Sequence, residues 1–134
     1  MNAFINARRD PESAPVTCHL PDGFKIEGMV VELQRALYGL VDSPALWYKE
    51  WTTTLSKLGL VPCIEEPCIF INELRTVFVV FYVDDVQLLY HKDNQAEAEA
   101  LLTGIKGTYK LHDLDDVKWF LGVRVVRDRA AKKI

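Results

Sequence analysis

The stretch Phe78–Leu89, "FVVFYVDDVQLL", is an apolar run interrupted by two adjacent aspartates and one glutamine. Strand-forming residues on both sides of Asp84 and Asp85 predict two antiparallel strands joined by a tight turn that carries the carboxylates. Because side chains alternate along a strand, the first strand should present two different faces. These faces would carry Val77, Val79, Phe81 and Val83 on one side and Phe78, Val80 and Tyr82 on the other.

Two interpretations of Asp84 and Asp85 follow from these residues alone. Acidic residues at a hairpin tip can simply keep the turn solvated. Alternatively, adjacent carboxylates on a rigid hairpin can form part of a divalent-metal site, since Mg²⁺ prefers oxygen ligands and a pair of ions about 4 Å apart can drive phosphoryl displacement. The apolar flanks would hold such a hairpin rigid and lower the dielectric constant around its charges.

The size and composition of the chain limit its class. Its 134 residues suffice for one domain with a core and are too few for two ordinary domains. Hydrophobic residues at 49% and charged residues at 26% are typical of a globular protein. The net charge of −3 means that binding to a polyanion would need local basic patches or other regions. Without a signal segment or a long apolar run, we expect a soluble, intracellular protein with no membrane partner.

The three cysteines, Cys18, Cys63 and Cys68, make an odd number without regular spacing. This argues against a disulfide framework and fits a reducing interior. A zinc site that combines them with His19 is an alternative, but the set lacks the paired C-x-x-C spacing of structural zinc sites. The sequence therefore favours free thiols.

The helix signals are strong at two places. Ser43 is predicted to cap a helix whose first residue is Pro44, and apolar residues then recur at three- and four-residue spacing up to Gly59. A second helix, rich in Ala and Glu, is predicted to begin after Asp93 or Asn94.

Strand signals surround these helices. Together they predict an α+β fold in which helices pack on one face of a largely antiparallel sheet. The predicted strands and strand pairs lie in residues 16–20, 28–38, 68–83, 86–91 and 117–128, with bends or turns at 21–23, Gly39, 72–75 and Gly122.

Five blocks of the sequence resemble the reverse transcriptases of copia-type (Pseudoviridae) retrotransposons. "YVDD", Tyr82–Asp85, resembles their metal-binding motif. "LYGLVDSPALWY", Leu37–Tyr48, and "VKWFLGVRV", Val117–Val125, are similar to two further blocks of that family. "PDGF", Pro21–Phe24, precedes the Leu37–Tyr48 block as it does in the family, and "EPCIFI", Glu66–Ile71, falls between that block and the aspartates. The resemblance therefore covers nearly the whole chain in the right order.

This resemblance implies a fold and an activity. Residues 1–134 would form a single truncated reverse transcriptase domain, part of the palm and fingers region, with a ferredoxin-like palm core. The intact enzyme would perform RNA-directed DNA polymerisation by two-metal nucleotidyl transfer with Mg²⁺. Its partners would be an RNA template, a DNA primer, deoxynucleoside triphosphates and the remaining polymerase and ribonuclease H regions of a polyprotein. Its location would be a cytoplasmic virus-like particle.

The resemblance also implies roles for individual residues. Asp84 and Asp85 would be the catalytic metal ligands. The residues implied at the nucleotide are Phe4, Gly39, Ser43, Pro44 and Tyr82. The residues implied in primer support are Trp119, Phe120, Leu121 and Gly122. Two of these assignments have plain alternatives, since Phe4 can be a core aromatic and the 119–122 segment can be a buried strand with a glycine bend.

Two departures from the family pattern matter. Val41 and Asp42 stand where Lys or Arg followed by Gln is common, which weakens nucleotide contact there. The first metal aspartate of the family would lie two positions before Met1. We therefore expect this chain alone to bind Mg²⁺ weakly and to be inactive, because the family's third carboxylate is absent. The alternative function is a domesticated or degenerate, non-catalytic fragment that acts as a binding or structural module.

Overall fold

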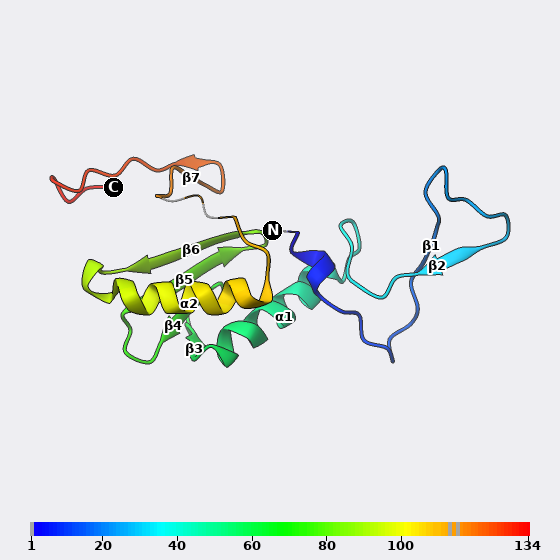
Figure 1. Ribbon diagram of the computed structural model, residues 1–134, viewed down its shortest axis with the longest axis horizontal. Helices are drawn as coiled ribbons and strands as arrows, with labels where there is room; N and C mark the ends of the chain where they lie inside the picture. Colours follow the sequence, from blue (N-terminus) through cyan, green and yellow to red (C-terminus); the bar gives the residue numbers. More distant parts are fainter. Residues whose placement is uncertain (1, 113, 115) are drawn as a thin grey trace. The chain divides into compact units, whose positions relative to one another are not determined.

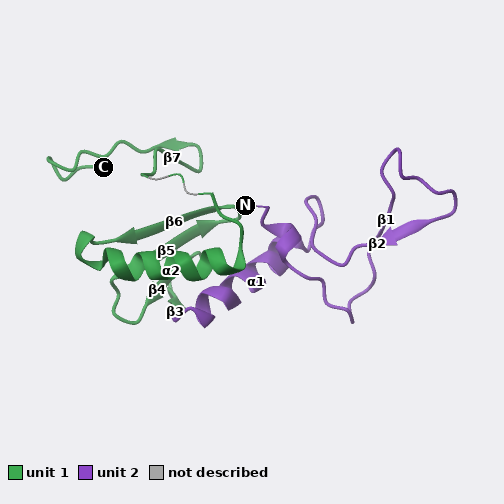
Figure 2. Ribbon diagram, in the orientation of Figure 1, with its two compact units in different colours: residues 1, 61–134 green, residues 2–60 purple. Residues whose placement is uncertain are grey.

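The computed structural model describes residues 2–112, 114 and 116–134. Over these residues the chain forms two α-helices and antiparallel sheets, which confirms the mixed helix and sheet content. The chain divides into two compact units, residues 2–60 and residues 61–134 (Figure 2). The assignment of residues 1–134 to one domain stays a prediction.

The unit of residues 2–60 contains one long helix and one short hairpin (Figure 1). The two strands of the hairpin pair antiparallel, with Cys18 opposite Val31. A 3-10 turn near the start of the chain contacts the helix. The elements of this unit are η1 (Phe4–Asn6), β1 (Thr17–His19), β2 (Val30–Glu32) and α1 (Ser43–Lys57).

Helix α1 begins one residue earlier than predicted. Its N-cap is Asp42, which makes no side-chain capping hydrogen bond, and Ser43 is the first helical residue. The assignment of Ser43 as the cap and Pro44 as the first residue is therefore wrong, because the Ser43 hydroxyl bonds to the preceding loop instead of the helix. The deeply buried side chains of the helix include Trp47, Trp51 and Leu55.

The unit of residues 61–134 is built on a four-stranded sheet whose strand order, β3-β4-β5-β6, follows the chain. β4 pairs antiparallel with β5, and β5 with β6. The strands are β3 (Leu60–Pro62), β4 (Ile69–Asn72), β5 (Val77–Tyr82) and β6 (Asp85–Tyr90). They are followed by η2 (Lys92–Asn94), α2 (Gln95–Thr108) and a second hairpin, β7 (Trp119–Phe120) and β8 (Val123–Arg124).

The predicted alternation along β5 is confirmed. Val77, Val79 and Phe81 are buried, whereas the residues between them are partly exposed. Phe70 of β4 pairs with Val79 and is equally buried, and its ring lies 6.0 Å from that of Phe81. One face of the sheet is therefore a compact apolar layer, which anchors the strand that leads to the two aspartates.

Helix α2 is tied to the sheet by polar contacts as well as by packing. The Asn72 side-chain amide donates to Glu97 Oε1 at 2.7 Å, and the Thr76 hydroxyl donates to Glu97 Oε2 at 2.6 Å. Asn72 Oδ1 also accepts from the backbone N–H groups of Thr76 and Val77, which closes the β4–β5 turn. This arrangement places α2 along the sheet (Figure 1). It does not establish the ferredoxin-like core, which stays a prediction.

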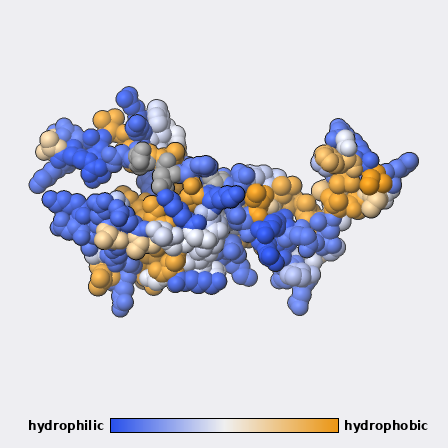
Figure 3. All heavy atoms as spheres, in the orientation of Figure 1, coloured by the Kyte–Doolittle hydropathy of each residue, from blue (hydrophilic) through white to orange (hydrophobic). Residues whose placement is uncertain are grey.

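Apolar side chains are also exposed, most visibly around the β1–β2 hairpin (Figure 3). Phe24 is 73% exposed, and Ile26 and Met29 are each more than half exposed. Within the described part of the chain, neither helix combines the length and the apolar character needed to cross a bilayer.

Candidate functional site

The hairpin formed by β5 and β6 carries the two aspartates in and beside a two-residue loop. Tyr82 pairs with Asp85 at the last rung of the ladder, so the loop consists of Val83 and Asp84. Asp84 is half-buried, and Asp85 is exposed at the start of β6. The predicted hairpin with both carboxylates at its tip is confirmed.

The loop of this hairpin holds an unusual backbone conformation. Val83 has a φ of 51°. Two-residue hairpin loops favour a positive φ at their first residue, but Gly, Asn or Asp usually supplies it. A β-branched residue in this region is a genuine outlier and costs on the order of 1–3 kcal/mol. Such strain persists only where the surrounding structure holds it, as the buried residues of β5 do here, and it constrains the position of Asp84.

The two carboxylates supply the ligand type that hard divalent cations prefer, but only part of a coordination shell. Mg²⁺ requires about six oxygens in octahedral geometry and dehydrates reluctantly. Among the described residues, no group of three or more His, Cys, Asp or Glu side chains could hold a metal ion. Asp84 and Asp85 therefore fit a metal site as partial ligands, with the other oxygens coming from substrate, water or other protein segments.

The cysteines do not form the alternative zinc site. All three thiols are free, and no cluster of metal ligands includes them within the described residues. Cys63 Sγ donates to Glu65 Oε2 at 3.1 Å, and this bond lowers the pKa of Glu65. Burial raises the pKa of the Cys68 thiol, and the nearby charge of Glu66 raises it further.

Phe4 packs against the loop that precedes α1. Its ring centroid lies 4.4 Å from that of Tyr38, with the ring planes tilted by 47°. Phe4 is 8% exposed, whereas Tyr38 is half exposed. The structure thus brings together two segments that the sequence analysis linked to the nucleotide. The burial of Phe4 is what a core aromatic shows, and its role at a sugar stays a prediction.

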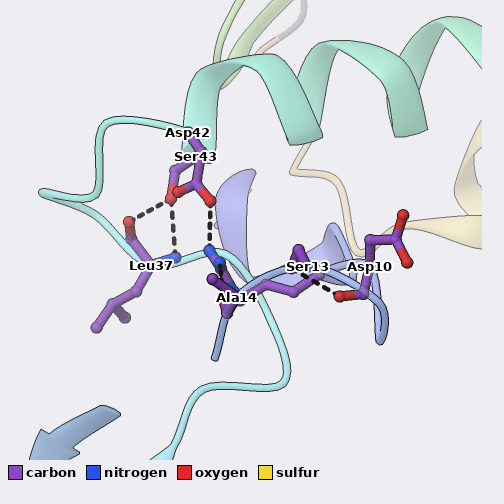
Figure 4. A network of polar contacts seen from close by, with 7 residues as sticks. Asp10, Ser13, Ala14, Leu37, Asp42 and Ser43 are labelled. Carbon is purple, nitrogen blue, oxygen red and sulfur yellow. Dashed lines mark hydrogen bonds and ion pairs between the residues drawn. The ribbon is translucent and has the colours of Figure 1, made fainter. Parts of the chain in front are cut away.

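Ser43 closes the loop of residues 37–43 (Figure 4). Its hydroxyl donates to the Leu37 carbonyl at 2.6 Å and accepts from the Leu37 N–H at 3.0 Å. Ser43 is fully buried, so these bonds form away from water. Gly39, with a φ of 94°, turns the backbone between them, and a Cβ there would meet no atom within 4 Å. The positive φ of Gly39 therefore favours glycine at this position, because within this unit no neighbouring atom would clash with a side chain there.

Asp42 has a partner that the sequence analysis did not identify. Its Oδ2 accepts a hydrogen bond from Arg9 Nη1 and forms an ion pair with it. The Arg9 side chain is 9% exposed. Val41, which precedes Asp42 in the sequence, is fully exposed. The negative charge of Asp42, which departs from the family pattern, is therefore neutralised within the 2–60 unit by the nearly buried Arg9 side chain.

The β7–β8 hairpin contains the four residues assigned to primer support. Its loop is Leu121 and Gly122, with φ values of 50° and 80°. Trp119 is 65% exposed and Leu121 51% exposed. The alternative of a buried strand is therefore wrong for this segment, although the glycine bend is confirmed. An exposed aromatic on a tight hairpin is available for contact with another molecule.

Sequence reasoning missed the contacts between distant parts of the chain. The Arg9–Asp42 pair joins residues 33 positions apart, and the Asn72–Glu97 bond joins residues 25 apart. No local pattern predicts which charged residue will find which partner over such separations.

Comparison with known proteins identifies clear relatives. Residues 1–134 match the family described as reverse transcriptase (RNA-dependent DNA polymerase). The chain is 28% identical over 142 residues to the retrovirus-related Pol polyprotein from transposon TNT 1-94 of Nicotiana tabacum, which covers 98% of this chain and 10% of that protein. It is 27% identical over 131 residues to the Pol polyprotein from transposon RE2 of Arabidopsis thaliana, covering 94% and 9%.

A shorter relative is the putative transposon Ty5-1 protein of Saccharomyces cerevisiae, 28% identical over 128 residues, with 92% of this chain and 40% of that protein covered. The chain spans about a tenth of the length of the two plant relatives. No solved structure matches it significantly.

Proposed function

Because the chain belongs to the reverse transcriptase (RNA-dependent DNA polymerase) family, we propose that it forms part of the palm of a copia-type retrotransposon polymerase. The Pol polyproteins of plant transposons among its relatives support the copia-type assignment. We further propose that residues 1–134 belong to one polymerase domain with a ferredoxin-like palm core. The other regions of a Pol polyprotein, including ribonuclease H, would be its covalent partners.

The proposed activity is RNA-directed DNA polymerisation. A primer 3′-hydroxyl loses its proton and attacks the α-phosphate of a deoxynucleoside triphosphate, and the bond from the α-phosphorus to the bridging oxygen breaks to release pyrophosphate. The observation that carries it is the hairpin with Asp84 and Asp85 at its tip and a strained Val83 beside them. Strained backbone is concentrated at functional sites, where it contributes to preorganisation. A merely solvated turn would not need a β-branched residue at positive φ.

Asp84 and Asp85 would contribute oxygen ligands to a divalent cation, most simply Mg²⁺. Bound there, the cation would supply positive charge opposite the reacting phosphate. The role of this chain is to hold the two carboxylates in a fixed direction. The apolar layer beneath β5 and the short loop perform that task, since a positioned charge stabilises a transition state without reorganising.

The nucleotide would meet residues of the 2–60 unit. Phe4 and Tyr38 would form an apolar wall for the sugar, and the loop from Leu37 to Ser43 would present its backbone. In this proposal Gly39, Ser43 and Pro44 shape that loop, and Tyr82 flanks the carboxylates. Trp119, Phe120, Leu121 and Gly122 would support the primer end through the exposed β7–β8 hairpin. The reaction would take place in a cytoplasmic virus-like particle.

The test is primer extension on an RNA template by a Pol protein that contains this segment. Asp84→Asn and Asp85→Asn preserve size but remove the charge, and each should lower the rate roughly a hundredfold or more. Asp93→Asn is the matched control, because Asp93 is an exposed carboxylate of the same unit. Equal activity of the Asp84, Asp85 and Asp93 variants would refute the proposal and favour a non-catalytic module.

A further inference from the structure

Two exposed arginines face each other in the 2–60 unit. Arg8 and Arg35 form an isolated antiparallel bridge. The flanking hydrogen bonds run from the Arg9 N–H to the Gln34 carbonyl at 3.1 Å and from the Ala36 N–H to the Ala7 carbonyl at 3.0 Å. This pattern makes Arg8 and Arg35 a non-hydrogen-bonded pair, the type in which opposite Cα atoms are closest, at about 4.5 Å. Their side chains therefore leave the same face of the ladder.

Like charges directly opposite each other destabilise a pair of strands. Both residues are exposed, and within the described part of the chain neither guanidinium forms an ion pair. Arg9, the residue that follows Arg8, differs because it pairs with Asp42. Of the three arginines in this unit, Arg9 is thus paired with a carboxylate, whereas Arg8 and Arg35 extend from one face of the ladder without an ion pair among the described residues.

The guanidinium of Arg35 is partly fixed in place. Its Nη1 donates to the Ile5 carbonyl at 3.0 Å and to the Asn6 carbonyl at 3.3 Å. These bonds orient the side chain and leave its remaining N–H groups available to a ligand. An oriented fork loses less side-chain entropy when it binds an anion. Among the described residues the Arg8 side chain makes no such bond, so it can move to meet the same anion.

We propose that Arg8 and Arg35 together bind a phosphate group of the substrate. Two forked donors on one face match the oxygens of a phosphate and would remove the mutual repulsion when it binds. The proposal rests on the proposed polymerase function, which brings two sources of phosphate: the backbone of a nucleic-acid strand and the triphosphate of a nucleotide. A local basic pair also supplies what a chain of net charge −3 needs in order to hold a polyanion.

The test measures binding by the unaltered chain and by Arg8→Ala and Arg35→Lys variants in EDTA. The probes are a fluorescently labelled RNA–DNA hybrid duplex, followed by anisotropy over a range of salt concentrations, and inorganic tripolyphosphate, followed by calorimetry. Arg127→Ala is the matched control, since it removes the same charge from an exposed arginine of the other unit. If Arg35→Lys fails to fold, Arg8→Ala still provides the test, because the Arg8 side chain makes no hydrogen bond or ion pair with the other described residues.

In a plot of the logarithm of the binding constant against the logarithm of the salt concentration, loss of one phosphate contact reduces the steepness of the slope by about 0.7–0.9. Near 0.1 M salt this weakens duplex binding roughly five- to eightfold. We expect this for Arg8→Ala and less than about a twofold change for Arg127→Ala. Weaker duplex binding with unchanged tripolyphosphate binding identifies a strand phosphate, and loss of both identifies the triphosphate.

Equal effects of Arg8→Ala and Arg127→Ala, or binding of neither probe by the unaltered chain, would overturn the proposal. Both probes are measured in EDTA, so neither outcome depends on a metal ion at Asp84. The catalytic role of Asp84 is thus tested separately by primer extension.

Discussion

Replacement of Ser43 by Ala tests whether this residue acts mainly by holding the loop beside the proposed nucleotide site. The variant removes the hydroxyl that bonds to both the N–H and the carbonyl of Leu37, at 3.0 and 2.6 Å. Because Ser43 is fully buried, water cannot replace these bonds without rearrangement. Unsatisfied buried polar groups cost about 1–3 kcal/mol, and the higher helix propensity of Ala offsets at most about 0.5 kcal/mol. The expected loss of unfolding free energy is therefore about 2 kcal/mol.

Urea unfolding followed by circular dichroism measures this loss, which corresponds to a midpoint lower by about 1 M for a typical denaturant dependence. Ser56→Ala is the control, since Ser56 is exposed on the same helix and should change the free energy by less than about 0.5 kcal/mol. If Ser43→Ala were as stable as Ser56→Ala, the loop would not depend on this hydroxyl. The assignment of Ser43 as a structural residue would then be wrong.

Three further outcomes are expected. Glu97→Ala should lower the free energy of unfolding in urea by about 1–3 kcal/mol, because two part-buried hydrogen bonds are lost. The exposed control Glu99→Ala should lower it by less than about 0.5 kcal/mol. Equal losses would contradict the stabilising role of the hydrogen bonds between Glu97 and the β4–β5 turn. Val83→Gly should be more stable than Val83→Ala by about 1 kcal/mol, since only glycine relieves the positive φ, and the reverse order would mean an unstrained loop. Glu66→Gln should speed the alkylation of Cys68 near neutral pH, because the Glu66 carboxylate raises the pKa of that thiol and disfavours the reactive thiolate. Mass spectrometry measures the alkylation rate, and an unchanged rate would exclude this effect of Glu66.

Local patterns predicted the elements that depend on neighbouring residues. The alternation around Val79 predicted the buried face of β5, and the polar break at Asp84 predicted the hairpin turn. Both are confirmed because strand side chains alternate whatever packs against them. The sequence pattern predicts the start of α1 one residue too late, since Ser43 has the properties of a cap but bonds to Leu37 across the loop.

Contacts between residues that are distant in the sequence could not be predicted from local sequence patterns. Nothing near Asp42 indicates that Arg9 will neutralise it, and the pattern around Trp119 suited a buried strand as well as the exposed hairpin that forms. The opposed pair of Arg8 and Arg35 emerges only when two segments align in a particular register. The site residues themselves were predicted through motif resemblance, which identifies residue types but not the interactions around them.

The most direct test of the account is to locate where a divalent cation meets this chain. Mn²⁺ is a paramagnetic substitute for Mg²⁺ and broadens the nuclear magnetic resonance signals of nearby amides. We predict that low concentrations of Mn²⁺ broaden the amide signals of residues 82–86 first and that Asp84→Asn abolishes this effect. The affinity for Mn²⁺ should be weak, because two carboxylates supply only part of the coordination shell. Broadening centred on other acidic residues, or unchanged broadening in Asp84→Asn, would contradict the assignment of the hairpin tip as the metal site.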